Sequence, residues 1–164
     1  MAQGYAAMVG RLHELLQGSA GASRPLDAAE HERVIWGMEP EGAVDSYLLW
    51  PIGDTDAVSA GPTDIISGPV VMRTAMFRLT LAAFCGGGEG GPSDEPAIAL
   101  ALMERWSRVV FLLGDPNNRD YATTGMVQCH GFQAGEPSKP NPEQRRMELS
   151  GTFTVQYDTA AAVM

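Results

Sequence analysis

The sequence predicts an α+β fold, in which a mainly antiparallel β-sheet carries two α-helices packed on one face. Two segments place apolar residues three and four positions apart, which is the spacing of one helix face. Several other segments alternate apolar and polar residues, which is typical of strands with one buried face. The order is helix, strands, helix and two strands, and strands in such an order pair mainly antiparallel.

The first predicted helix runs from Tyr5 to Gln17. Its apolar residues form one stripe, and Gly18 follows where a left-handed residue can end a helix. We expect Arg11, Glu14 and Gln17 to face away from the core. The stripe consists of Tyr5, Met8, Val9, Leu12, Leu15 and Leu16.

Three strands are predicted next, over 33–38, 45–52 and 70–85. In the third of these, Phe77 and Leu79 alternate with Arg78 and Thr80.

The second helix is predicted over 94–113, with Asp94 as its cap and Gly114 as its end. Its buried stripe would be Ile98, Leu102, Trp106, Val109, Val110 and Leu113. A turn through Asn117 and Asn118 then leads to the last two strands, over 125–133 and 145–159. The final strand alternates almost without fault between apolar residues and residues rich in hydroxyl groups, so we expect its hydroxyl face to meet water or a partner.

Residues 1–164 are expected to form a single domain, with long loops at 53–69, 86–93 and 134–144. The last of these contains Pro137, Pro140 and Pro142, which would stiffen it into an extended arm. The start of the chain lacks the pattern of a signal peptide, and no apolar run is long enough for a membrane span, so we expect no contact with a membrane.

The net charge of −9 at pH 7 disfavours binding to nucleic acid through neutralised phosphates. Cys85 and Cys129 form no paired motif, and we interpret both as reduced, buried thiols of a protein made in the cytoplasm.

No motif predicts a catalytic, cofactor or metal site. Cys129 and His130 are adjacent, but neighbours in a strand point to opposite faces and cannot share a proton. His13, His31 and His130 lack the spacing of metal ligands. The glycine run at 86–91 lacks the Lys-Ser/Thr pair of a phosphate loop.

Asp54, Asp56 and Asp64 lie in one predicted loop without the pattern of a calcium site, so a solvated acidic loop is the preferred interpretation. Arg145 and Arg146 are one basic pair, which is a weak signal for an acidic partner.

The three tryptophans are too far apart in sequence to indicate a base-stacking platform. Trp106 is expected in the core and Trp50 half exposed at a strand end, where aromatic side chains are enriched at interfaces.

With this layout, the chain resembles the tail terminators (tail completion proteins) of long-tailed bacteriophages. The resemblance is carried by the opening helix "YAAMVGRLHELLQG", by "SYLLWPIGD", by the long strand "VVMRTAMFRLTLAAF", by the helix "EPAIALALMERWSRVVFLLGDP", by "GMVQCHGFQAG" and by the closing strand "MELSGTFTVQYDT". It lies in the order of the elements and not in diagnostic residues.

The resemblance implies a structural virion protein without enzymatic activity or cofactor. A ring of copies, usually a hexamer, would sit at the head-proximal end of the tail tube, stop tube polymerisation and join the tail to the head's neck proteins. Its partners would be further copies of itself, the tail tube protein and the neck or head-completion protein, while genomic DNA passes the acidic bore without specific binding. The loop with Asp54, Asp56 and Asp64 is the candidate for lining that bore.

Three alternatives remain at this stage. The chain could be another neck or tail-tube component of a phage, a small α+β enzyme or ligand-binding domain, or a chaperone-like or adaptor module. The enzyme would require convergent polar groups around a pocket, and alanine at Cys129, His130 or Asp54 would then abolish turnover.

Overall fold

The computed structural model describes residues 5–17, 34–36, 46–55, 72–84, 95–138 and 146–158. The elements are α1 (Tyr5–Gln17), β1 (Val34–Trp36), β2 (Ser46–Thr55), β3 (Met72–Phe84), α3 (Glu95–Gly114), the 3-10 helix η1 (Pro116–Asn118), α4 (Tyr121–Thr124), β4 (Met126–Ala134) and β5 (Arg146–Asp158).

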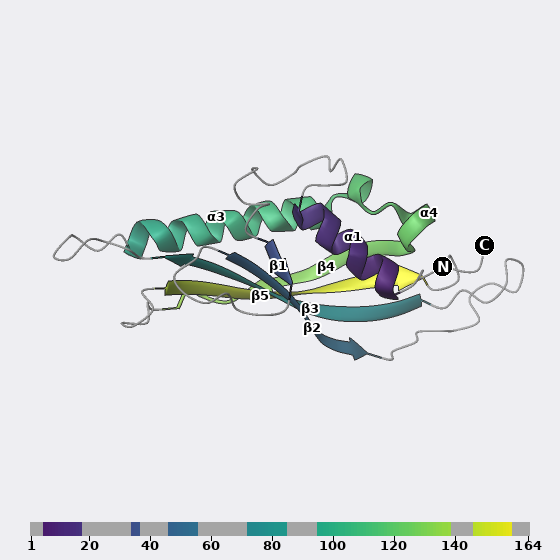
Figure 1. The fold of residues 1–164 in the computed structure, drawn as a ribbon, viewed down its shortest axis with the longest axis horizontal. Coiled ribbons are helices and arrows are strands. Elements are labelled where there is room, and N and C mark those ends of the chain that lie inside the picture. The colour runs from purple at the N-terminus through teal and green to yellow at the C-terminus, as the bar shows by residue number, and fades with distance from the viewer. Residues whose placement is uncertain are drawn as a thin grey trace, which may run out of the picture.

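The strands form one sheet in the order β1-β2-β3-β5-β4. Strands β2, β3, β5 and β4 pair antiparallel, while the short β1 runs parallel to β2. Helices α1 and α3 lie on the same side of this sheet (Figure 1). The predicted α+β fold with two helices on one face of a mainly antiparallel sheet is therefore confirmed.

The core lies between the two helices and the sheet, and alternate residues of the central strands supply it. Phe77 on β3 and Phe153 on β5 are cross-strand partners with ring centroids 5.6 Å apart, and Phe132 on β4 lies 5.7 Å from Phe153. The three rings join three adjacent strands, and stacked aromatic pairs of this kind add to the free energy gained by burial.

Trp106 fixes α3 onto β5 at a glycine. A Cβ atom built on Gly151 would lie only 2.2 Å from the indole ring of Trp106. The indole therefore occupies the space above the β5 backbone that any other residue's side chain would need. Trp106 is buried, as predicted, and its ring makes an edge contact with Phe132 at 6.4 Å.

The structure corrects the prediction for Arg11, which was expected to face away from the core. Its side chain is buried, and Nε donates a hydrogen bond of 2.8 Å to the backbone carbonyl of Asn118. Asn118 is itself buried and donates from Nδ2 to the carbonyl of Leu112, which ties the last residue of η1 to the final turn of α3. Arg11 thus joins α1 to the chain that follows α3. Glu14 and Gln17 are exposed, as predicted.

The loop boundaries also differ from those predicted. Strand β2 continues to Thr55, so 53–55 belongs to the sheet, and a register shift between Pro51 and Gly53 lets the strand bend there. The predicted loop at 134–144 begins within β4, and the segment 135–138 still follows β5. Its backbone donates from Gly135 to Ser150 and from Ser138 to Glu148. The rest of the loops at 53–69 and 134–144, and all of 86–93, lie outside the described residues.

The short helix α4 was not predicted. Four residues are too few for a periodic pattern, and the two ends are set by residues with positive φ, Asp120 at 48° and Gly125 at 72°. The predicted turn at Asn117 and Asn118 is the 3-10 helix η1. Asp115 caps this helix, because its carboxylate accepts a hydrogen bond of 2.9 Å from the backbone N–H of Asn117.

Replacing Gly151 by alanine is expected to lower the free energy of unfolding by about 1–3 kcal/mol, because the added methyl group overlaps the ring of Trp106 and forces it to move. Urea unfolding of Gly151→Ala measures the loss. The double variant Gly151→Ala, Trp106→Leu should lose less than the sum of the two single changes, because the smaller side chain leaves room for the methyl group. Strict additivity would contradict the contact.

Candidate interaction surfaces

The face of the sheet that points away from α1 and α3 is rich in hydroxyl and amide groups. Thr80 and Ser150 are cross-strand partners whose hydroxyl oxygens are 3.0 Å apart and hydrogen-bonded. Gln128 and Gln156 are partners on β4 and β5, and the Gln128 side chain donates to the Gln156 side chain. The same face carries Thr74, Arg78, His130, Thr152 and Thr154. We call this set the polar sheet face.

The polar sheet face confirms the predicted hydroxyl-rich side of the last strand. It spans β3, β5 and β4, and its side chains range from half-buried to exposed. Trp50 on β2 adds an aromatic side chain opposite Arg78, and its exposed fraction of 52% confirms the predicted half-exposure. The predicted place at a strand end is wrong, because β2 continues from Trp50 to Thr55. Side chains that both donate and accept hydrogen bonds, next to an exposed aromatic ring, are suited to contact another protein.

Cys129 and His130 do not form a catalytic pair. Cys129 is buried in the core and forms no disulfide, as predicted. His130 lies on the polar sheet face opposite Thr154. Burial raises the pKa of the Cys129 thiol to about 12, although the nearby positive charge of Arg119 opposes this change. The thiol is therefore protonated at neutral pH and is a poor nucleophile.

The remaining predicted site residues do not come together. Asp54 lies in β2 opposite Ala75, and not in a loop. Asp56, Asp64, His31 and Arg145 lie outside the described residues. His13 lies on α1 and is half-buried. In the described part of the chain, no three side chains of the types that ligate metals are close enough to hold an ion.

Arg146, the other member of the predicted basic pair, is buried and not exposed. Its side chain is only 4% exposed, and its Nε lies 3.4 Å from a carboxylate oxygen of Glu148. The charge of Arg146 is therefore directed at its own strand, which makes it unsuited to an acidic partner.

A polar tie at the end of β5 was missed by sequence reasoning. The hydroxyl of Tyr121 donates a hydrogen bond of 2.6 Å to the carboxylate of Asp158, which is itself buried. The backbone N–H of Asp158 donates to the carbonyl of Gly125 at 2.7 Å. A Cβ atom on Gly125 would lie 2.3 Å from the Asp158 carbonyl oxygen, so glycine is required there for packing as well as for its φ. Gly125 was the one signal in the sequence that could have indicated this tie.

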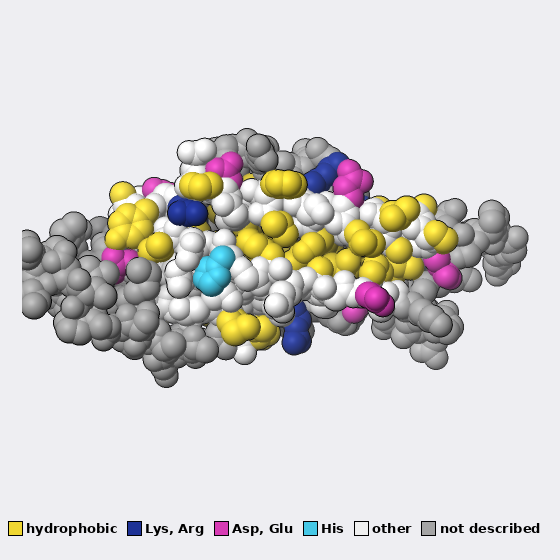
Figure 2. Space-filling model, turned by 180° about the vertical axis from the view of Figure 1, so that it is seen from behind, with side chains coloured by type: hydrophobic (Ala, Val, Ile, Leu, Met, Phe, Trp, Pro, Cys, Tyr) yellow, Lys and Arg dark blue, Asp and Glu magenta, His cyan; other side chains and the backbone are white. Residues whose placement is uncertain are grey.

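The outer side of α3 carries large apolar side chains. Leu100, Met103 and Phe111 are 66%, 50% and 59% exposed. Seen from behind, hydrophobic side chains form a band along the part of the molecule in which α3 lies (Figure 2). An exposed apolar stripe on a helix usually marks a contact surface.

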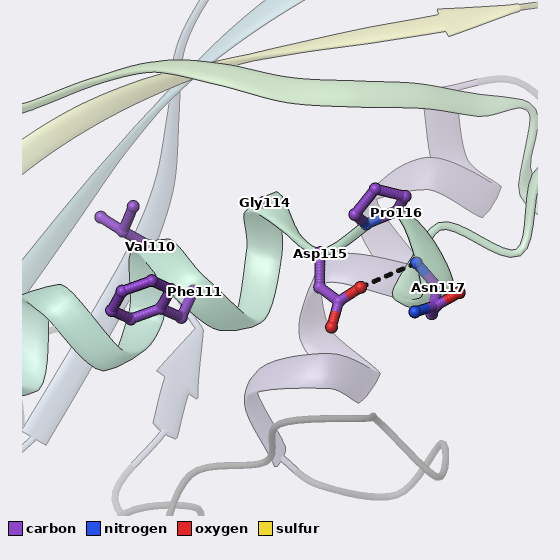
Figure 3. Close-up of a pocket in the computed structure, with 6 residues that line it drawn as sticks. All are labelled: Val110, Phe111, Gly114, Asp115, Pro116 and Asn117. Atoms are coloured by element: carbon purple, nitrogen blue, oxygen red, sulfur yellow. Dashed lines mark hydrogen bonds between the residues drawn. The ribbon is translucent and has the colours of Figure 1, made fainter.

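A pocket of about 400 Å³ adjoins this stripe at the C-terminal end of α3 (Figure 3). It is lined by Val110, Phe111, Gly114, Asp115, Pro116 and Asn117. The Asp115 carboxylate is engaged by the backbone N–H of Asn117, so the pocket's acidic group already serves as the cap of η1.

Among the described residues, no helix combines the length and the apolar content that crossing a membrane requires.

The chain is similar to chains of solved structures. No protein-family model matches the chain. No curated protein is similar to it. One chain of the structure titled "Virion of native gene transfer agent (GTA) particle" covers 94% of this chain and 99% of its own length, at 15% identity and a TM-score of 0.48. A similarity at this level carries no functional argument, so the function is argued from the residues of this chain.

Replacing Tyr121 by phenylalanine is expected to cost about 1–2 kcal/mol of stability, because the buried Asp158 carboxylate loses a hydrogen bond. The hydrogen bond to Asp158, together with burial and the charge of that carboxylate, raises the pKa of Tyr121. Since the folded-state pKa lies above that of the unfolded chain, the contribution is complete below about pH 10 and is lost as the pH rises through the folded-state pKa. Urea unfolding from pH 7 upward should show the two proteins converging at high pH. A constant difference would contradict the tie.

In the folded protein, the thiol of Cys129 is expected to react very slowly with thiol reagents at mildly alkaline pH. In a Cys85→Ser variant it is the one remaining thiol. A pKa near 12 lowers the thiolate fraction at pH 8 by about a thousandfold relative to an ordinary cysteine, and burial slows access further. Ellman's reagent should therefore react at once in denaturant and very slowly with the folded protein. Equal rates in both states would show that Cys129 is accessible.

Proposed function

We propose that this chain is a structural subunit of a phage-like virion, and that it forms a ring, expected to be a hexamer, at the head-proximal end of a tail tube. The ring ends tube polymerisation and joins the tail to the neck proteins of the head. The proposal is supported by the order of the elements, which resembles that of tail terminators.

The observation that carries the proposal is the division of the sheet into two different faces. The residues of β3 and β5 that point toward α1 and α3 are apolar and buried, while their neighbours form the polar sheet face. Hydrogen-bonding groups held in fixed register on a rigid sheet present a defined surface to a neighbouring protein. A subunit that closes a ring by head-to-tail contacts requires such a surface together with a second, different one.

The edges of the sheet are suited to provide the second surface. Strands β1 and β4 are the outermost strands in the described sheet, and each pairs with one neighbour there. An outer strand presents backbone N–H and C=O groups that can pair with an extended segment of an adjacent subunit.

The charge of the chain fits a passage for DNA. At −9, the subunit lacks the attraction to phosphates that basic DNA-binding proteins use, so DNA can move past a ring of copies without being held.

The test is genetic and structural. In cells that produce the particle, removal of this chain should give tail tubes of uncontrolled length and heads without joined tails, and the unmodified chain should restore both. Ser150→Arg should fail to restore them, because it places a bulky cation on the polar sheet face at an exposed position where folding is not disturbed. Electron microscopy of the particles measures tube length and joining.

The matched controls are Cys129→Ala and Asp54→Ala. Under the structural proposal, both variants keep the fold and restore joined tails. Unchanged tail length and joining after removal of the chain would overturn the proposal. So would an enzymatic turnover of the unmodified chain that is lost in Cys129→Ala or Asp54→Ala.

A further inference from the structure

A straight stripe of five residues runs along α3, and three of them carry large, exposed apolar side chains. Leu100, Met103, Ser107, Phe111 and Gly114 are separated by three, four, four and three residues, which places them on one line along the helix. The core residues Leu102, Trp106 and Val109 lie on the other side of the same helix. We call this line of five residues the α3 stripe.

The α3 stripe is symmetric about Ser107. Met103 and Phe111 lie four residues to either side, and Leu100 and Gly114 lie seven residues to either side. If a second α3 runs antiparallel across the first with Ser107 at the midpoint, each Met103 meets a Phe111 and each Leu100 meets a Gly114. Sulfur and aromatic side chains attract one another, and a small residue at the midpoint allows a close approach of the helices.

The pocket at the end of α3 completes this match. Leu100 is the most exposed large apolar side chain of the stripe, and Gly114 presents no side chain of its own. The pocket of about 400 Å³ is lined by Gly114 and Phe111, and a leucine side chain fits within that volume (Figure 3). The antiparallel arrangement therefore places the Leu100 side chain of each copy over the pocket of the other copy.

The charges on α3 also favour a second copy. The helix carries Glu95, Glu104, Arg105 and Arg108, so it has no net charge although the chain as a whole has −9. Glu104 and Arg108 already form an ion pair of 3.3 Å on one flank of the stripe. In the antiparallel arrangement this flank faces the same flank of the partner, with Glu104 and the other copy's Arg108 only about 3 Å apart along the axis.

We propose that two copies of this chain associate through the α3 stripe, antiparallel and about a twofold axis at Ser107. This contact is isologous, whereas ring closure uses head-to-tail contacts. The inference thus goes beyond the proposed ring and does not rest on it.

A disulfide at the midpoint tests the register. Ser107→Cys, in a Cys85→Ser background, places two thiols opposite each other across the twofold axis, within the range that a disulfide spans. Oxidation should give a covalent dimer as the main species on a non-reducing gel. Leu100→Cys in the same background should give none, because the two copies of residue 100 lie about 21 Å apart along the helices.

Two results would overturn the proposal. Absence of the disulfide in Ser107→Cys would show that the midpoints do not meet. Equal cross-linking in Leu100→Cys would show a parallel pairing. The Cys85→Ser background alone is the control and should give no dimer, because the remaining thiol, Cys129, is buried. A ring held by head-to-tail contacts alone gives no bond at residue 107, so the outcome is independent of the proposed function.

Sedimentation provides a second measurement. Leu100→Asp should raise the dissociation constant of the dimer by roughly tenfold or more, because it removes an apolar side chain and places a carboxylate in the partner's pocket, which already contains Asp115. The matched control is Ile52→Asp, which changes an apolar side chain of 39% exposure on β2, outside the stripe, and should leave association unchanged. Circular dichroism verifies that both variants are folded. Equal association of Leu100→Asp and the unmodified chain would contradict the proposal.

Discussion

The contact between Trp106 and the backbone at Gly151 is the constraint on which the rest of the structure depends. The indole ring lies where any side chain at residue 151 would have to be, so α3 is held close to β5 along this part of the sheet. Because β5 is hydrogen-bonded to both β3 and β4, this contact fixes the helix relative to three strands. The aromatic rings of Phe77, Phe153 and Phe132 continue the same packing across those strands.

With one face of the sheet filled by α1 and α3, the alternation of β5 directs its other side chains outward. The polar sheet face therefore follows from the packing of the core. Each apolar residue that points toward the helices has a neighbour in the strand that points to the opposite side. The face is rigid because the strands beneath it are packed against the helices. A rigid polar surface is an economical basis for specific contacts, since few side chains have to be ordered when a partner binds.

The surface of α3 has a different character from the polar sheet face. It is apolar and without net charge, in a chain that is strongly acidic. Copies of an acidic chain repel one another over most approaches, so a neutral helix with projecting apolar side chains is the part at which like subunits can meet. The two surfaces therefore suit different contacts, with hydrogen bonding dominant in one and burial of apolar area in the other.

The sequence by itself determined the long helices and strands and the apolar side of each, because helix and strand periodicities are local and survive in the order of residues. It also predicted the buried Trp106 and Cys129 and the exposed Trp50. Only the tertiary structure decided that Arg11 is buried, since its acceptor at Asn118 is distant in sequence. The same holds for the Tyr121–Asp158 tie and for the requirement at Gly151. Contacts between residues far apart in the chain leave no periodic pattern in the sequence. Which of these contacts form depends on the free energy of burial, which is gained only when the helices and strands pack together.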